Sequence, residues 1–250
     1  FRRVLFRSKA PRAPIAIGNF LKNISSGGAL VWSGDIKSSF PSMKNQVAAG
    51  LNMGIAGIPW WTTDIGGFFG ANINDPEFHE LLVRWFEYGC FCPVMRLHGY
   101  RWPLQPQYGT TGGATCVSGA PNEVWSYTDQ VCEILSDYLR LRERMLPYIT
   151  ELMEEAHEKG TPVMRPLFYD FPEDKESWNV ETEYMFGPKV LVKPITDADA
   201  RETDVYLPGG ASWTNAWTGE TFEGGQKVHV AAPIEQIPLF TRDGYKLPMK

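Results

Sequence analysis

Three short apolar segments, each followed by polar side chains and separated by helix-like stretches, constrain the fold of this chain most. The segments are ALVWSGD (29–35), IAGIPWW (55–61, continued by TTDIGGFFG) and FCPVMRLHG (91–99). A helix is expected over about 41–53, before Gly54. A second helix is expected from Asp75, a good N-cap residue that is followed by Pro76. This alternation of strands and helices is typical of a parallel sheet.

All three segments end in side chains that can do chemistry: Asp35, then Asp64, then Arg96 and His98. In a (β/α)8 barrel, catalytic groups gather at the C-terminal ends of the strands, around one shared mouth. A doubly wound sheet also binds ligands at strand C-termini, so the local pattern by itself leaves that fold open. We predict an α/β fold that is the C-terminal part of a (β/α)8 TIM barrel.

The second half of the chain changes from helical to strand periodicity. Residues 102–124 are rich in Gly, Pro and Thr and are expected to form either a functional loop over the mouth or a mobile one. A long helical pattern over 126–159 is interrupted at Pro147 and stopped by Gly160. Strands are then expected at 161–171, 189–196, 202–208, 212–217 and 227–234. They predict an antiparallel β-sandwich domain over 165–250, after a barrel portion over 9–164.

The first residues do not fit these elements. FRRVLFRS (1–8) is basic, lacks the apolar core of a secretion signal and resembles a translated sequencing adapter, so it is excluded from the fold. Residues 9–28 show neither the helical nor the strand periodicity of apolar residues, and no helix or strand is assigned to them. We therefore expect the native protein to extend upstream of this sequence.

Composition narrows the function classes. The net charge of −5 and the lack of a Lys/Arg cluster beyond the first residues argue against nucleic acid as a partner. No apolar run approaches the roughly 18 residues of a membrane span. The four cysteines (90, 92, 116 and 132) do not suggest a disulfide framework, and their C-F-C spacing does not match a zinc site. Nine Trp suit a protein that packs against flat apolar rings. Oligomeric state and location, in the cytoplasm or exported, stay open.

Asp35 allows two interpretations. It can be a general acid or base at the barrel mouth, or the cap of the helix that follows. The nearby Trp32 favours the first, because an aromatic ring beside a carboxylate is what the apolar face of a sugar packs against.

Asp64 lies in WWTTDIGGFF, a stretch in which Trp61 and Phe68 are placed to wall a pocket. The alternative is a buried acid paired with Arg96, and the two interpretations are compatible. His98 is expected to contact a sugar hydroxyl, since no second His lies at the spacing of metal ligands and a metal site is therefore not expected.

Several motifs in consistent order resemble glycoside hydrolase family 31, in its catalytic barrel and the β-sandwich that follows. They are VWSGD (31–35), GIPWWTTDIGGF (57–68), PVMRLHG (93–99), RMLPYI (144–149) and GTPVMRPLF (160–168). The resemblance covers about residue 29 to the C-terminus. WWTTDIGGF and MRLHG are most similar to the bacterial α-xylosidase branch, which acts on xyloglucan fragments.

This resemblance implies a retaining mechanism with an aspartate nucleophile and an aspartate acid/base, and Asp35 matches the acid/base. Retention needs two carboxyl groups about 5–5.5 Å apart and water, so no cofactor is expected. With the residues discussed above, the predicted substrate contacts are Trp32, Trp61, Asp64, Phe68, Arg96 and His98.

The first part of the chain departs from the family pattern. No aspartate precedes Asp35 to act as the nucleophile, and Arg12 does not stand where the family has a sugar-binding arginine. We therefore expect a C-terminal fragment that is inactive alone and prone to aggregate through open strand edges. The predicted function is release of terminal α-linked xylose from xyloglucan-type oligosaccharides. The alternatives are an α-glucosidase or α-glucosyltransferase, and a non-catalytic carbohydrate-binding remnant.

Overall fold

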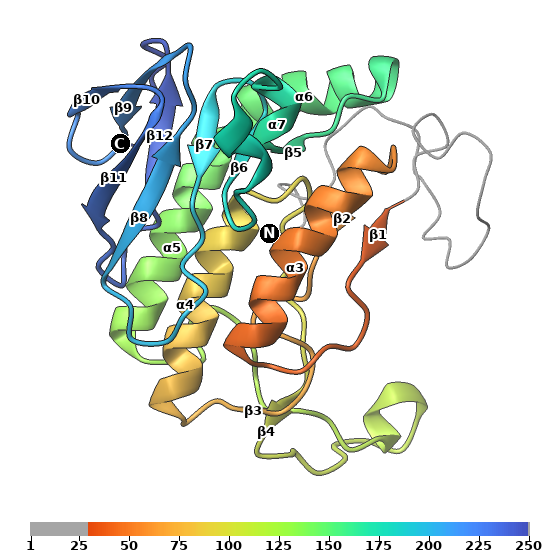
Figure 1. Ribbon diagram of the computed structural model, residues 1–250. Helices are drawn as coiled ribbons and strands as arrows, with labels where there is room; N and C mark the ends of the chain where they lie inside the picture. Colours follow the sequence, from red (N-terminus) through yellow and green to blue (C-terminus); the bar gives the residue numbers. More distant parts are fainter. Residues whose placement is uncertain (1–29, 250) are drawn as a thin grey trace.

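The computed structural model describes residues 30–249. The predictions made for residues 1–8, for residues 9–28 and for Arg12 lie outside the described residues. The described chain begins with short strands alternating with helices and ends in antiparallel sheet (Figure 1). Among residues 30–249, no helix has the length and apolar character needed to cross a membrane.

The first strands are short and parallel. β1 (Val31–Trp32) pairs with β2 (Trp61–Thr62), and β3 (Ala71–Asn72) pairs with β4 (Arg101–Trp102). Single parallel bridges also join Lys37 to Phe69 and Ile65 to Leu97. Because parallel neighbours keep their C-terminal ends together, this part of the chain gathers its strand ends on one side.

Two helices occupy the predicted connections. α3 (Phe40–Ile55) is capped by Ser39, and α4 (Pro76–Cys90) is capped by Asp75, as predicted. The Asp75 side chain accepts a hydrogen bond from the Glu77 N–H at 3.0 Å. Each cap satisfies a donor that the first helical turn leaves free, and this fixes where the helix starts.

α3 ends later than the sequence indicated. It runs through Gly54 and stops before Gly57, whose φ of +83° is accessible to glycine at little cost. Gly54 has a packing role, because a Cβ at this position would lie 2.9 Å from the backbone oxygen of Met164. The helix therefore packs closely against the following sheet at the position where the sequence suggested its end.

The third predicted strand, 91–99, is not a regular strand. Its first residues form a turn and bends directly after α4, so the backbone straightens only near Leu97, which bridges to Ile65. A hydrogen bond of 3.1 Å from the Val94 N–H to the Trp61 oxygen holds the segment beside β2. The segment thus follows the expected path without forming the expected ladder.

The interrupted helical pattern corresponds to two helices, α5 (Asp129–Arg144) and α6 (Leu146–Lys159). Met145 separates them, and Pro147 lies in the first turn of α6, where a missing N–H costs nothing. Gly160 ends α6 with a φ of +71°, as its position in the sequence predicted. α4 and α5 pack against each other along their length (Figure 1).

The last part of the chain forms antiparallel sheet, as predicted. Six strands pair in the order β10-β9-β12-β7-β6-β5, and β8 pairs with β11 in a separate ribbon. Their bounds are β5 (Met164–Pro166), β6 (Tyr184–Phe186), β7 (Val190–Val192), β8 (Glu202–Leu207), β9 (Ser212–Asn215), β10 (Thr221–Glu223), β11 (Gln226–Ala231) and β12 (Leu239–Arg242). The short helical segments are α7 (Leu167–Asp170), η1 (Gly112–Thr115) and η2 (Lys175–Trp178).

The six-stranded sheet is the middle of three layers, because its side chains alternate between two cores. One core joins the sheet to α3, α4, α5 and α6, and the other joins it to the β8–β11 ribbon. The first face is formed by Tyr184, Phe186, Val190, Val192 and Leu239. The second face is formed by Met185, Leu191, Trp213 and Phe240. The sheet is thus buried on both sides in its centre, which leaves the barrel helices and the sheet region with a shared core.

Three of these strands, β6, β10 and β12, were not predicted, and the predicted strand 161–171 is cut short. β5 occupies only its middle, and α7 replaces its end. β6 is buried throughout and β12 is buried up to Arg242, so their sequences lack the apolar–polar alternation that marks a half-exposed strand.

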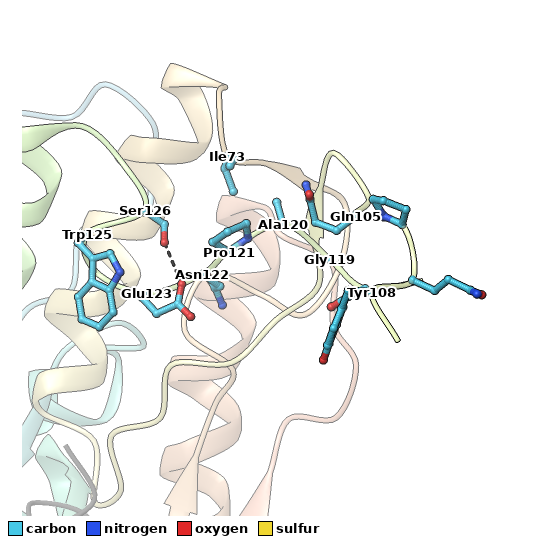
Figure 2. A pocket seen from close by; sticks show the side chains of 13 residues that line it. Ile73, Gln105, Tyr108, Gly119, Ala120, Pro121, Asn122, Glu123, Trp125 and Ser126 are labelled. Atoms are coloured by element: carbon cyan, nitrogen blue, oxygen red, sulfur yellow. Dashed lines mark hydrogen bonds between the residues drawn. The ribbon is translucent and has the colours of Figure 1, made fainter. Parts of the chain in front are cut away.

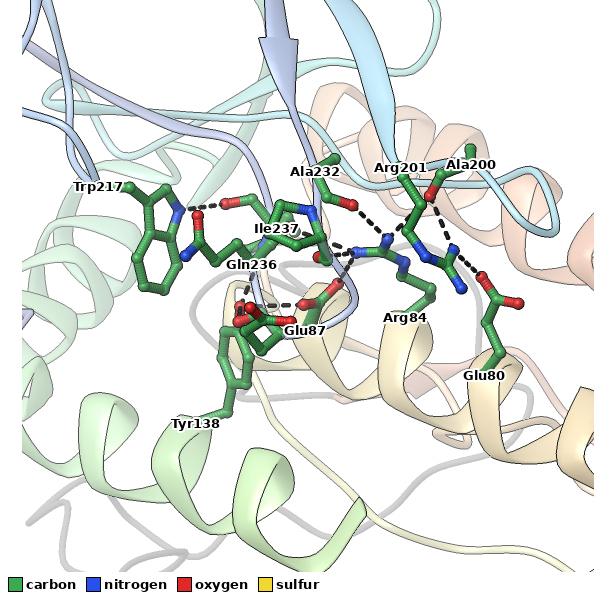
Figure 3. Close-up of polar contacts among 12 residues, drawn as sticks. Glu80, Arg84, Glu87, Tyr138, Ala200, Arg201, Trp217, Ala232, Gln236 and Ile237 are labelled. Atoms are coloured by element: carbon green, nitrogen blue, oxygen red, sulfur yellow. Dashed lines mark hydrogen bonds and ion pairs between the residues drawn. The ribbon is translucent and has the colours of Figure 1, made fainter. Parts of the chain in front are cut away.

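A buried polar network joins α4 to the sheet region (Figure 3). Arg84 and Glu87 are fully buried and form an ion pair at 3.2 Å. The Tyr138 hydroxyl, from α5, lies 3.1 Å from the other carboxylate oxygen of Glu87. Arg84 also donates to the backbone oxygens of Ala200, Ala232, Pro233 and Gln236. One guanidinium therefore ties together two loops of the sheet region and a barrel helix.

Burial raises the pKa of Glu87 to about 8, although Arg84 and Tyr138 oppose this shift. Between its ordinary value of 4.5 and about 8, the folded protein then binds one more proton at this site than the unfolded chain. The contribution of Glu87 to stability is therefore fully present below pH 4.5 and is lost as pH rises through about 8. The expected slope is about −1.4 kcal/mol per pH unit within this window.

Urea unfolding of the chain and of Glu87→Gln, from pH 4.5 to 8.5, measures this contribution. The free energy of unfolding is plotted against pH for both proteins, and the difference between the two curves will have this slope. Gln keeps the shape of the side chain and does not titrate. Glu133→Gln, at an exposed position of α5, is the matched control for the loss of one carboxyl group. Equal slopes in the chain and in Glu87→Gln would show that Glu87 is ionised in the fold.

Candidate active site

Asp35 follows β1 on a turn that Gly34 makes possible, with a φ of +71°. Its side chain is exposed, and Trp32 beside it is half-buried. Ser39 caps α3, so the interpretation of Asp35 as a helix cap is wrong. The carboxylate is therefore free of a structural role in the helix and faces solvent at the C-terminal end of a barrel strand.

Asp64, after β2, forms the ion pair with Arg96 that the sequence suggested, at 2.6 Å. Asp64 is fully buried, whereas the Arg96 side chain is 34% exposed. The guanidinium carbon of Arg96 lies over the Trp32 ring, 5.8 Å from its centre. Arg96 therefore contacts the end of β1, just before the turn that carries Asp35. The Ser33 hydroxyl, 3.4 Å from the Asp64 N–H, links the same two strand ends.

The rings of His98 and Phe68 lie together. Their ring centres are 5.6 Å apart at a tilt of 38°. Phe68 is half-buried and His98 is exposed, so an imidazole edge is available to solvent beside an aromatic face. The two residues come from different segments, and the Tyr100 N–H donates to the Phe68 oxygen to hold these segments together.

The charged groups of this cluster shift one another's pKa values. Burial raises the pKa of Asp64, while the positive charge of Arg96 opposes the shift. Burial lowers the pKa of His98, and Arg96 lowers it further. The negative charge of Asp35 acts on the pKa of both residues. His98 is therefore a neutral imidazole at pH 7, able to exchange a hydrogen bond with a hydroxyl group.

Trp61 does not join the cluster. It is only 3% exposed and packs against α3, where a Cβ on Gly50 would lie 2.7 Å from its indole nitrogen. The expectation that Trp61 walls the pocket therefore needs correction, because successive strand residues point to opposite faces and this one points into the core. The structure brings together Trp32, Asp35, Asp64, Phe68, Arg96 and His98.

Arg101, which no sequence pattern marked as a site residue, stabilises the backbone turn that follows Asp64. Its buried guanidinium donates to the oxygens of Ile65 and Gly67, at 3.1 and 2.8 Å, and to the Asn122 side chain at 3.1 Å. It also lies 4.8 Å from the Phe78 ring centre. Arg101 thus fixes the turn after Asp64 and ties it to the long loop. An arginine beside a Gly- and Pro-rich stretch carries no sequence signal that distinguishes this role from a surface position.

Within residues 30–249, no three His, Cys, Asp or Glu side chains are grouped so as to hold a metal ion.

Two family descriptions match successive parts of the chain. Residues 25–152 match the glycosyl hydrolases family 31 TIM-barrel domain, and residues 160–247 match the glycosyl hydrolase family 31 C-terminal domain. The chain belongs to glycoside hydrolase family 31. The predicted barrel region followed by antiparallel sheet is confirmed by these matches and by the topology described above.

Members of family 31 with known names are similar over most of the chain. The α-xylosidase of Saccharolobus solfataricus is 38% identical over 221 residues, and α-glucosidase 2 of Bacillus thermoamyloliquefaciens is 35% identical over 217 residues. The crystal structure of a family 31 α-xylosidase from a soil metagenome, complexed with xylose, is 53% identical and superimposes with a TM-score of 0.84.

These matches cover 88%, 86% and 88% of this chain, but only 28%, 25% and 33% of the three family 31 proteins. The chain therefore spans about a quarter to a third of the length of the relatives it matches.

Proposed function

We propose that this chain carries the acid/base half of a retaining α-glycoside hydrolase site that releases terminal α-linked xylose from xyloglucan-type oligosaccharides. The observation that carries the proposal is the exposed Asp35 carboxylate at the end of β1, beside Trp32 and next to the Asp64–Arg96 pair and His98. This is the arrangement of a proton donor at the rim of a sugar pocket. Membership of family 31 supports a glycoside hydrolase as the reaction class.

In the first step, protonated Asp35 gives its proton to the glycosidic oxygen while a nucleophilic carboxylate attacks the anomeric carbon, and the alcohol leaves. In the second step, Asp35 takes a proton from water as the water displaces the enzyme carboxylate. Asp64 does not serve as the nucleophile, because it is fully buried and paired with Arg96. We assign the nucleophile to a barrel strand outside this sequence, as the family resemblance implies.

The remaining residues bind and orient the sugar. The half-buried Trp32 and Phe68 offer apolar ring faces, and His98 and Arg96 offer hydrogen bonds to hydroxyl groups. Asp64 keeps Arg96 in place at 2.6 Å, so its effect on the substrate passes through the arginine. A pocket of this kind binds one neutral sugar ring in a fixed orientation.

The choice of xylose over glucose depends on the space for one hydroxymethyl group. Similarity to two α-xylosidases, at 38% and 53% identity, supports xylose. The 35% identity to an α-glucosidase keeps glucose as the alternative sugar.

The preference for xylose over glucose is tested in a longer protein. In it, this chain is joined to the further barrel strands that our proposal requires, including the one that carries the nucleophile. It will hydrolyse an aryl α-xyloside with a kcat/KM about 10–200-fold above that for the matching α-glucoside, because a pocket shaped for xylose excludes the added group. Steady-state rates on the two substrates give the ratio directly. Equal values would contradict the assignment to xylose.

The 250-residue chain by itself is the control. It will show no steady-state turnover of the aryl α-xyloside, since one carboxylate cannot complete the two-step reaction. Turnover by the purified chain would show that its nucleophile lies within the sequence.

A further inference from the structure

The backbone that follows Asp35 is held by the loop that follows β2. The Phe68 N–H donates to the Ile36 oxygen at 2.7 Å. The Ser38 N–H donates to the Phe69 oxygen at 2.8 Å. Because the Asp35 side chain is exposed, its position depends on the backbone on either side of it. These two hydrogen bonds therefore fix the backbone directly after the carboxylate that we assign as the acid/base.

This loop approaches so closely because residue 67 is a glycine. Gly67 has a φ of +75°, and a Cβ at this position would lie 2.6 Å from the Ser38 Cα and 2.7 Å from the Ser38 nitrogen. A side chain here would therefore push the two backbones apart. Gly70, in the same loop, has a φ of +87°, but its Cβ would meet only the Lys37 side chain, at an ordinary distance of 3.7 Å. Of these two glycines, Gly67 sets the distance between the loop and the backbone after Asp35.

A buried arginine holds Gly67 in this place. The Arg101 guanidinium donates to the Gly67 oxygen at 2.8 Å and to the Ile65 oxygen at 3.1 Å, so it bridges the two ends of the turn. Arg101 is fully buried, and a Cβ on Gly66 would lie 2.9 Å from one of its terminal nitrogens. Burying a guanidinium costs free energy, and its hydrogen bonds to the turn offset this cost. The turn and the arginine therefore fix each other.

Arg101 also ties the turn to the long loop between β4 and α5. Its Nε donates to the side-chain oxygen of Asn122 at 3.1 Å, and the Tyr127 hydroxyl donates to the same oxygen at 2.6 Å. Figure 2 shows Asn122 on the arm of this loop that leads to α5, where the Ser126 hydroxyl donates to Glu123. The guanidinium is thus held on one side by the turn and on the other side by the loop.

We propose that Arg101 and Gly67 are positioning residues for Asp35, which press the loop after β2 against residues 36–38 and so hold the carboxylate in place for proton transfer. The proposal rests on the proposed function for the role of Asp35. Both residues are buried, so they act through the backbone and not by contact with the sugar. A displaced carboxylate slows the step that needs its proton, because proton transfer requires hydrogen-bond distance.

Gly67→Ala in the longer protein tests the proposal. We expect it to lower kcat/KM for a xyloglucan-type oligosaccharide by about 10²-fold. The loss for an aryl α-xyloside with an acidic phenol will be much smaller, since this leaving group needs little protonation. A loss of folded protein, or a shift of Phe68 in the sugar pocket, affects both substrates alike. Gly70→Ala is the matched control, because it has a similar φ and does not meet the backbone of Ser38, and it will leave the ratio of the two kcat/KM values unchanged.

Two further variants examine the arginine and the route to Asp35. Arg101→Lys will change the ratio in the same direction as Gly67→Ala, because one ammonium group cannot replace the contacts of the planar guanidinium. In the Asp35→Asn background, Gly67→Ala will cost no more than Gly70→Ala, since no acid is left to position. Equal losses on both substrates in Gly67→Ala would overturn the proposal, as would a full extra loss in the Asp35→Asn background.

Amide hydrogen exchange in the 250-residue chain separates this proposal from the proposed function. We expect exchange at the Ser38 N–H to become about tenfold faster in Gly67→Ala and to stay unchanged in Gly70→Ala. Arg101→Lys will also speed this exchange. The Ala216 N–H, which is hydrogen-bonded in the sheet region, is the internal reference for global stability.

Unchanged exchange at Ser38 relative to Ala216 would overturn the proposal even if the longer protein is active. Failure of the proposed function gives a different result. In that case the longer protein would hydrolyse neither substrate, while exchange at Ser38 would still depend on Gly67 and Arg101.

Discussion

Replacing Asp35 by Asn will lower kcat for hydrolysis of xyloglucan-type oligosaccharides by about 10²–10⁴-fold in a longer form that supplies the nucleophile. Asn has nearly the shape of Asp but cannot give a proton to the leaving oxygen or take one from water. The exposed position of Asp35 means that the fold does not depend on its charge. The loss will therefore appear in the rate and not in the stability, and the two are measured separately by initial rates and by urea unfolding.

The dependence on the leaving group sharpens this test. An aryl α-xyloside with an acidic phenol needs little protonation to leave, so the bond-breaking step in Asp35→Asn will be slowed less for this substrate than for an oligosaccharide. Asp137→Asn, at an exposed carboxylate of α5 that pairs with Arg140, is the matched control and will keep full activity. If Asp35→Asn retains full kcat on the oligosaccharide, another group provides the proton.

Local signals predicted the elements that position Asp35 and its neighbours. Asp75 before a proline, and Gly160 after a helical run, act through backbone chemistry within a few residues, and the structure confirms both. The ends of β1 and β2, with Asp35 and Asp64, were found for the same reason: an apolar run followed by an acid is visible in the chain itself.

Residues whose role depends on distant partners were harder to predict. Trp61 is visible in the sequence as a large ring beside Asp64, and only the face of the strand that it occupies decides that its ring points to the core. Arg84 and Glu87 are three residues apart on a helix, the spacing of an ordinary surface ion pair. Their complete burial follows from loops around residues 200 and 232–236, more than a hundred residues away, and no local pattern encodes it.

Arg84→Met will lower the free energy of unfolding by about 3–5 kcal/mol, a large fraction of the stability of an ordinary domain. The substitution keeps much of the apolar volume but removes every donor from a fully buried position. Four backbone oxygens then lose their partner, and Glu87 loses a hydrogen-bond donor. Urea unfolding monitored by fluorescence and by circular dichroism measures the change.

Two comparisons show whether the loss comes from the buried network. Arg140→Met removes an exposed pair with Asp137, in which both side chains are more than 60% exposed, and will cost at most about 1 kcal/mol. Arg84→Lys keeps a positive charge, but one ammonium group cannot reach all the oxygens that the planar guanidinium contacts, so its cost will lie between the two. If Arg84→Met costs no more than Arg140→Met, the sheet region docks on α4 through apolar contacts alone. A large cost in Arg84→Met shows instead that this arginine fixes the sheet region against the helix that follows the Asp64 turn.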